Sequence, residues 1–461
     1  MIGETVTHPQ FGQGQITATY RNGTEWLVRF NNRLRFRRPS HEFKEFAAVE
    51  PVEQAEVFVP PPPMAQTQWE ARQLVEALRL GIAPAQEVND LTIGLQKERE
   101  SLGKALTQAH KHGGAVRAVV GEYGFGKSHI VELTAQEALQ RNFLVATISL
   151  DLLELPPHRA FAIYAEAMRH LRYPDTDERG LRPLLEKSAE IDRAVTQLRD
   201  LSPAKLDPLI IGLNAISNTR STRQRKAWIN WLMGGRRTKV MNKGLPRGLK
   251  FPSIYKVGHN ARQIAFLLTG MSTLARLANY SGLCILIDEA ESYSLLHKYQ
   301  RPKASTFFQA VIYAALRDQQ KQLQPDQFKQ HRFREYPLAY DKGQSLFFMF
   351  TVTRSDNRMP LDDWLDADQI FHLEPEVTPL EVGQFLERVM GYHARAYGYE
   401  LGDRQRQVRR GSAELIAQGL RNGSLSMRQT ARLAVELFDL LYLHPDYAVA
   451  TLLDELRDQV R

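Results

Sequence analysis

The fold of this chain is decided by one stretch, Gly121-Glu122-Tyr123-Gly124-Phe125-Gly126-Lys127-Ser128. It matches G-x-x-x-x-G-K-[ST], the pattern of a loop whose backbone N–H groups surround phosphates. The apolar run at 115–120 directly precedes it and predicts a buried strand, and the residues from Ser128 to Gln140 predict a helix. The pattern requires this order of strand, glycine-rich loop and helix, so a chance glycine-rich turn is the weaker interpretation.

The residue types in this loop predict how a nucleotide is held. Glycines let the chain turn so that successive N–H groups and the helix N-terminus face an anion. Lys127 is placed to bridge the β- and γ-phosphates, and the Ser128 hydroxyl to join the shell of a magnesium ion. We therefore predict ATP and Mg²⁺ as cofactors. The predicted cofactor-binding residues are Gly121, Glu122, Tyr123, Gly124, Phe125, Gly126, Lys127, Ser128 and His129.

A second apolar run, 283–287, ends in the two carboxylates Asp288 and Glu289. A buried strand of the same sheet delivers its carboxyl end beside the phosphate loop, so Asp288 is predicted to hold magnesium. Glu289 is then placed to orient or deprotonate the attacking water. Glu291 is either a further acid of the site or a solvated residue at the start of a helix.

A third apolar strand, predicted over 345–351, runs into hydroxyl-bearing residues. If this strand lies between the other two, Thr353 faces the γ-phosphate or the water, with Thr351 one pleat away. The alternative is a strand that simply leaves the core.

The alternation of short apolar runs with helical periodicity predicts an α/β fold with a mostly parallel sheet covered on both faces. We divide the chain into a small all-β barrel at 1–57, a proline-rich linker at 58–68 and an ATPase domain at 69–375. That domain has a helical insertion at about 152–260. Only helical pattern remains over 376–461, which we predict to be a separate helical domain.

Composition narrows the class of protein further. With 43% hydrophobic and 24% charged residues, the chain is typical of a globular protein. No apolar run approaches the roughly 20 residues that cross a bilayer, and the N-terminus lacks the regions of a signal peptide. A single cysteine, Cys284, excludes an intrachain disulfide and a cysteine-rich zinc site. We expect a cytoplasmic protein with no membrane contact.

The formal charge of +8 is unevenly distributed, because no Asp or Glu occurs between Asp207 and Asp288. A field of one sign over so long a span predicts an anionic partner, and Trp228 and Trp231 among the cations suggest base stacking on DNA. Two alternatives are that these tryptophans form a small helical core, or that the cations meet an acidic protein or subunit. The predicted DNA contacts are Arg220, Arg223, Arg225, Lys226, Arg236, Arg237, Lys239 and Lys243.

Together these parts resemble the AAA+ superfamily, in its branch of origin-recognition and initiator-type ATPases. The resemblance implies that the C-terminal helices form a lid and that Arg428, within Ser426-Met427-Arg428, reaches the γ-phosphate. Arg432, one turn on, is the alternative. The family uses arginine fingers between subunits, which implies a homo-oligomer, but no motif selects one among Arg317, Arg332, Arg334 and Arg354.

A closer resemblance is to the BrxC/BrxD ATP-binding family of BREX phage-defence systems. It rests on the segments 76–84 and 91–94, on the phosphate loop with His129, and on 280–291. It implies a role in recognising or restricting foreign DNA together with other proteins of one operon, such as a helicase or methyltransferase.

The N-terminal module is similar to the small Tudor-like barrel appended to some superfamily 1 helicases, through the segments 6–16 and 26–30. Several arginines there, from Arg29 to Arg38, suit a phosphate contact, although a protein partner is equally compatible.

Our leading hypothesis is a DNA-associated ATPase of a phage-defence system. The alternative is a nucleotide-gated scaffold with little turnover that recruits a helicase, nuclease or methyltransferase. A signalling switch is a third class, but no effector or repeat domain supports it.

Overall fold

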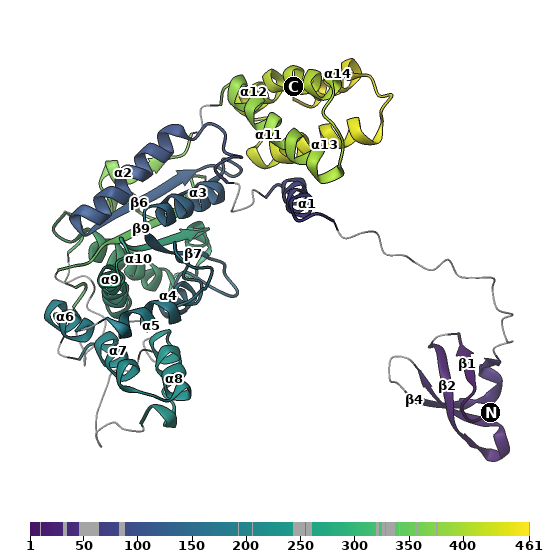
Figure 1. Cartoon of the computed structure of the whole chain (residues 1–461), viewed down its shortest axis with the longest axis horizontal. Coiled ribbons are helices and arrows are strands. Elements are labelled where there is room, and N and C mark those ends of the chain that lie inside the picture. Colours follow the sequence, from purple (N-terminus) through teal and green to yellow (C-terminus); the bar gives the residue numbers. More distant parts are fainter. Residues whose placement is uncertain are drawn as a thin grey trace. The chain divides into compact units, whose positions relative to one another are not determined.

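The computed structural model describes residues 1–9, 11–30, 35–45, 64–82, 88–191, 193–204, 206–242, 254, 261–319, 322–324, 328, 337–340, 342–355, 357–374 and 377–460. The chain forms two compact units, Met1–Met64 and Ala65–Arg461 (Figure 1). Among the helices in the described ranges, none is both long and apolar enough to cross a membrane.

The first unit is an antiparallel sheet of five short strands, in the order β4-β3-β2-β1-β5. Alternate residues of β2 and β3 point inward, so Ile16, Trp26, Val28 and Phe30 form most of a small core. The strand bounds are β1 Thr5–His8, β2 Gly12–Tyr20, β3 Glu25–Phe30, β4 Arg35–Pro39 and β5 Lys44–Glu45. The predicted small β module is therefore present.

The second unit contains a parallel five-stranded sheet, in the order β10-β6-β9-β8-β7. Its register pairs Gly121 with Thr353 and Ser149 with Asp288, so the carboxyl ends of four strands meet at one edge. The bounds are β6 Gly114–Gly121, β7 Phe143–Ser149, β8 Gly282–Asp288, β9 Leu346–Thr353 and β10 Ile370–His372. This confirms the predicted α/β class and places β9 between the P-loop strand and the strand of Asp288.

Helices cover both faces of this sheet because its strands are apolar on both sides. On one face pack α2 (Gln96–His112) and α3 (Lys127–Gln140). On the other pack α4 (Ala160–Arg169), α9 (Ala261–Leu277) and α10 (Arg301–Leu316). α10 ends at Leu316, and the next residue, Arg317, takes a left-handed φ of 52°.

The insertion continues the core of that second face. Its helices are α5 (Arg182–Glu190), α6 (Ala194–Leu201), α7 (Pro208–Asn218) and α8 (Thr222–Leu232). Their apolar residues belong to the same buried cluster as α4, α9 and α10. The insertion is therefore part of the ATPase core and not a separately packed body.

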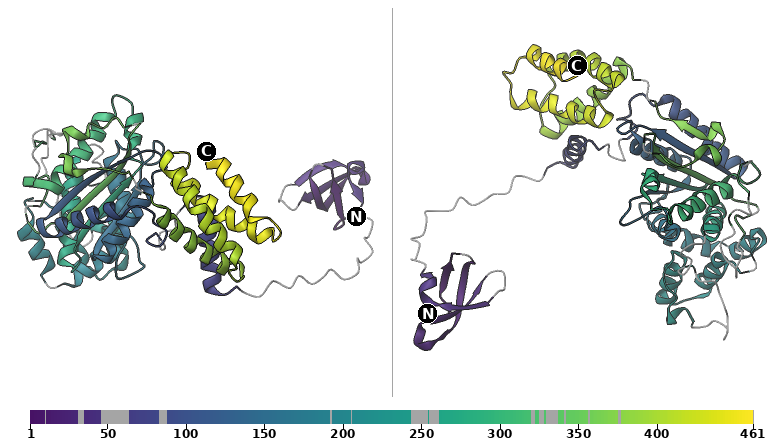
Figure 2. Two further views of the ribbon diagram at one scale, coloured as in Figure 1. Left: turned by 90° about the horizontal axis from the view of Figure 1, so that it is seen from above. Right: turned by 180° about the vertical axis from the view of Figure 1, so that it is seen from behind.

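The C-terminal helices are α11 (Pro379–Tyr397), α12 (Asp403–Asn422), α13 (Met427–Leu443) and α14 (Val449–Val460). They share a hydrophobic core with α1 (Gln66–Arg79), whose Ala71, Leu74, Val75 and Leu78 are buried against them (Figure 2). The predicted domain 69–375 groups α1 with the ATPase core, whereas its buried face packs on the C-terminal helices. Helical periodicity does not identify the element that covers such a face.

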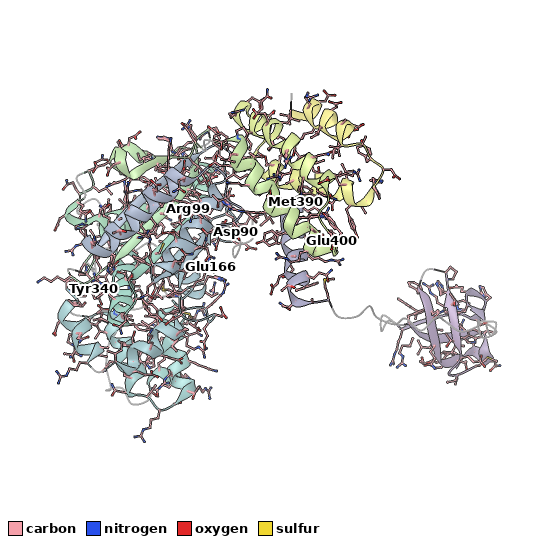
Figure 3. All side chains as sticks on the ribbon, turned by 45° about the horizontal axis from the view of Figure 1, so that its top comes forward. Asp90, Arg99, Glu166, Tyr340, Met390 and Glu400 are labelled. Atoms are coloured by element: carbon pink, nitrogen blue, oxygen red, sulfur yellow. The ribbon has the colours of Figure 1, made fainter. Side chains whose placement is uncertain are left out.

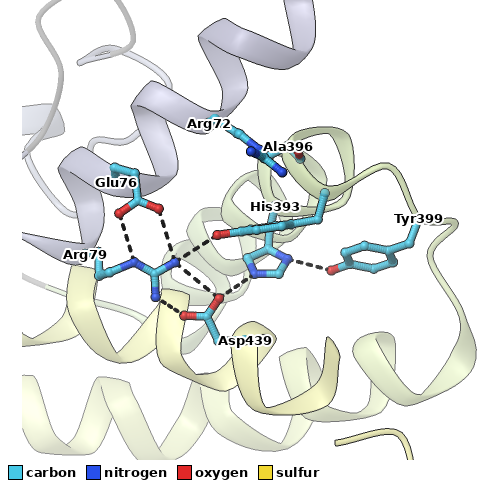
Figure 4. Close-up of polar contacts among 8 residues, drawn as sticks. Arg72, Glu76, Arg79, His393, Ala396, Tyr399 and Asp439 are labelled. Atoms are coloured by element: carbon cyan, nitrogen blue, oxygen red, sulfur yellow. Dashed lines mark hydrogen bonds and ion pairs between the residues drawn. The ribbon is translucent and has the colours of Figure 1, made fainter. Parts of the chain in front are cut away.

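Polar contacts also join α1 to this bundle (Figure 4). Arg79 forms an ion pair with Asp439 of α13 and donates to the Tyr397 hydroxyl at 3.0 Å. On its other side Asp439 lies 3.0 Å from Nε2 of His393, which is fully buried and contacts the Tyr399 hydroxyl at 2.9 Å. Buried polar groups that are mutually satisfied fix one arrangement of the helices that carry them.

Candidate nucleotide-binding site

The glycine-rich loop connects β6, which ends at Gly121, to α3, which begins at Lys127. Gly124 and Gly126 have φ values of 86° and 89°, a left-handed region that strains side-chain-bearing residues. The Lys127 ammonium lies 3.4 Å from the Gly121 carbonyl oxygen and 3.3 Å from that of Glu122. The loop is thus folded into a turn at the N-terminus of α3, and the Lys127 ammonium lies against the carbonyl groups at the start of this turn.

Two acids at the end of β8 lie at the same edge of the sheet. Asp288 accepts a hydrogen bond of 2.5 Å from the Thr351 hydroxyl and one of 3.0 Å from the Glu289 backbone N–H. Glu289, the residue after β8, has a left-handed φ of 59° and lines the cavity described below. Partial burial, and then the neighbouring charges of Glu291 and Asp288, raise the pKa of Glu289.

The second hydroxyl of β9 holds a further acid. Thr353 donates to Oε1 of Glu291, while Oε2 of Glu291 is buried and has no partner among the described residues. Thr351 and Thr353 are two residues apart and therefore lie on one face of β9. Of the two alternatives for Glu291, a further acid of the site agrees with this contact. The period of two along β9 is the signal that could have connected both hydroxyls to acids.

The N-terminus of α13 contacts the loop directly. The Met427 N–H donates to the Gly124 carbonyl at 3.2 Å, and Arg428 donates to the Tyr123 hydroxyl at 3.2 Å. Arg432, the alternative to Arg428, instead donates to the Leu80 carbonyl at 3.2 Å. Of the two arginines, Arg428 is the one that lines the cavity described next.

A cavity of about 290 Å³ lies between the loop, the acids and the C-terminal helices. One part is polar, with Lys127, Ser128, Glu289 and Glu291. The other is apolar and of the kind that accepts a flat aromatic base. It is formed by Leu78, Ile82, Leu91, Ile93, Leu95, Phe385, Met427 and Ala431. Sequence reasoning missed this apolar part, because its residues come from three distant segments.

The segment 88–95 joins the two sides of this cavity. Arg388 of α11 donates to the Asp90 carbonyl, and Arg99 of α2 donates to Asn89 at 3.1 Å; Asp90 and Arg99 are labelled in Figure 3. His129, predicted to bind the cofactor, contacts the Thr92 hydroxyl through Nε2 at 2.8 Å. Desolvation lowers the pKa of His129 to about 4, so the ring is neutral and positions this segment.

Oxygen donors suited to magnesium are present, since the Ser128 hydroxyl and the Asp288 carboxylate lie at the same edge of the sheet. These two residues would hold a magnesium ion, which would supply positive charge to neutralise phosphate groups. The arrangement is that of a P-loop ATP-binding site.

A match to a known protein family agrees with this geometry. Residues 67–205 match the model of a family described as the BREX system ATP-binding protein BrxC/D. The match covers less than half of the chain: all but the first residue of α1, the whole of α2 and the glycine-rich loop. It ends before Asp288 and the C-terminal helices, and it supports a P-loop ATP-binding protein.

Among solved structures, the chain is similar to the Walker-type ATPase of Pyrococcus abyssi, with 12% identity, 77% of each chain covered and a TM-score of 0.28. The fold of the ATPase unit is defined by the order and register of its own strands. None of the curated proteins matches the chain.

The insertion differs from the expected DNA surface in one respect. Trp228 and Trp231 are 0% and 1% exposed and pack edge to face at 5.4 Å, so neither ring can stack on a base. Base stacking by these two rings was a wrong prediction, and the alternative that they form a helical core is confirmed, because α8 buries both. Exposed cations remain at Arg220, Arg223, Lys226, Arg236, Arg237 and Lys239; Arg225 is half-buried and Lys243 lies outside the described residues.

The candidates for an arginine finger have different surroundings. Arg354 binds Glu374 at 2.7 Å, and Arg317 occupies the strained end of α10. Arg332 and Arg334 lie outside the described residues.

Proposed function

We propose that this chain is a DNA-associated ATPase of a BREX-like phage-defence system. The single observation that carries the ATPase assignment is that Glu289 and Glu291 line the same cavity as the phosphate loop. Two threonines of β9 hold Glu291 and the adjacent Asp288 in place. A site that only binds nucleotide has no need for several ordered acids beside the γ-phosphate position.

Each group has a role that follows from its chemistry. Lys127 binds the β- and γ-phosphates, and Ser128 with Asp288 holds the metal ion. Glu289 accepts a proton from the attacking water, which its raised pKa favours. Arg428, next to Tyr123 at the cavity, stabilises charge on the γ-phosphate when nucleotide is bound.

DNA association rests on the exposed cations of the insertion, from Arg220 to Lys239, in a region without acidic residues. When such a surface neutralises DNA phosphates, the counterions of those phosphates are released, and this release favours binding that is independent of sequence. Coupling to a partner such as a helicase or methyltransferase, and assembly into a homo-oligomer, belong to the same proposal.

Steady-state ATP hydrolysis with and without double-stranded DNA tests this proposal, with Glu289→Gln as the blank. We expect turnover that the blank lacks and that DNA stimulates. A low rate that is indifferent to DNA favours a nucleotide-gated scaffold that recruits a partner enzyme.

A second test addresses the phosphate loop itself. Lys127→Ala removes the charge on the β- and γ-phosphates, and ATP affinity is expected to fall at least about tenfold, roughly 1.4 kcal/mol. Unchanged affinity for a fluorescent ATP analogue would contradict the site.

A further inference from the structure

Two arginines on one face of the N-terminal unit lie directly opposite each other. Arg29 of β3 and Arg35 of β4 are register partners, and both side chains are exposed. Like charges at opposed positions of neighbouring strands repel and weaken the sheet. Such a pair becomes favourable only when an anion lies between the two guanidinium groups.

The carboxylates nearby serve other cations. Glu25 forms an ion pair with Arg37 at 2.7 Å, and Glu42 lies 4.0 Å from Arg38. Within the described part of this unit, Arg29 and Arg35 form no ion pair. The unit thus contains paired and unpaired arginines on the same two strands.

The unpaired arginines border an open hollow of about 680 Å³. Register partners place Thr5, Gln15, Arg29 and Arg35 in one row across four strands, so hydroxyl, amide and guanidinium groups share one face. The Gln15 amide is fixed in place, because its Nε2 donates to the Gly3 carbonyl at 2.8 Å. The hollow is thus lined mainly by polar side chains, two of them cationic.

We propose that this hollow binds a backbone phosphate of DNA. The planar fork of each guanidinium matches phosphate oxygens bidentately. The same face carries Tyr20, 40% exposed, with the Arg37 guanidinium 4.1 Å from its ring centre, a platform on which a base can stack. An acidic peptide is the other candidate, but protein interfaces centre on apolar anchors, which this polar hollow does not provide.

The experiment uses the full chain and a fluorescein-labelled 30-base-pair DNA, with affinity measured by anisotropy between 50 and 200 mM KCl. Arg29→Ala/Arg35→Ala should weaken binding at least tenfold at low salt. Losing this one phosphate contact should also reduce the slope of log affinity against log salt by about 0.9. The matched control removes the same charge from paired arginines through Arg21→Asn/Arg38→Ala, where asparagine suits the left-handed backbone of residue 21.

The control should leave the slope nearly unchanged. Equal slopes in all three proteins, equal losses in both variants, or no DNA binding by the parent chain would each overturn the proposal. The proposal would also be overturned if Arg29→Ala/Arg35→Ala lost affinity for an oligoglutamate peptide but bound DNA like the parent chain. DNA-free ATP hydrolysis should be the same in all three proteins, so a failed ATPase assignment shows up separately. Thermal melting should not be lowered in Arg29→Ala/Arg35→Ala, because the repulsion is relieved.

Discussion

At the scale of single residues, the two hydroxyls of β9 divide the acids of the site between them. Thr351 donates a hydrogen bond to Asp288, and Thr353 donates one to Glu291. The second carboxylate oxygen of Glu291 has no hydrogen-bond partner among the described residues. We expect Glu291→Gln to lower turnover about tenfold with ATP affinity retained, and Thr353→Val to do the same. The double variant should be no worse than either single one, because both changes act on one unit. Multiplying effects would show that Thr353 acts elsewhere.

The raised pKa of Glu289 predicts a dependence on pH in two measurements. As a base it must be ionised, so turnover should fall on acidification with an apparent pKa above its ordinary value of 4.5. For stability the sign is opposite: the folded protein holds this proton more tightly, so its contribution is present below pH 4.5 and is lost as pH rises through the raised pKa. Glu289→Gln should therefore melt at a higher temperature than the parent chain at neutral pH and at the same temperature in acid.

The residues of the phosphate loop and of the Asp288-Glu289 strand could be predicted because their chemistry is written locally, within a strand, a turn and a helix. The partners of those residues could not, because hydrogen bonds such as Thr353 to Glu291 span 62 positions. The sequence fixes which side chains are available, and only the sheet order brings them together.

At the scale of elements, α1 belongs with the C-terminal helices. Arg79→Ala and Asp439→Asn test this by a double-mutant cycle on thermal or denaturant unfolding. Since the pair is partly exposed, we expect a coupling of about 1 kcal/mol. A matched control is Arg457 with Asp454, an exposed pair within α14, whose coupling should be smaller. Equal coupling in the two pairs would mean that the α1 contact adds nothing.

The strands β6, β8 and β9 were predicted to within a few residues, since each is a short apolar run between turns. Helix partners were harder to predict. The amphipathic pattern of α1 specifies a buried face of Ala71, Leu74 and Leu78, and that face would fit the ATPase core as well as the lid helices.

At the scale of the whole molecule, the insertion contributes both core and charge. Arg236→Glu/Arg237→Glu/Lys239→Glu should weaken DNA binding at least tenfold and reduce its salt dependence, with ATP hydrolysis in the absence of DNA retained. Trp228→Ala is the contrasting variant, because removing a fully buried ring should cost about 3–5 kcal/mol of unfolding free energy. If the charge-reversal variant bound DNA like the parent chain, the insertion would not be the surface.

The packing of α1 on the C-terminal helices has a mechanical consequence. The chain enters the second unit through α1, so the first helix after the N-terminal unit is held by the C-terminal helices and not by the sheet. A displacement of those helices relative to the sheet would therefore also move the point at which the chain enters the second unit.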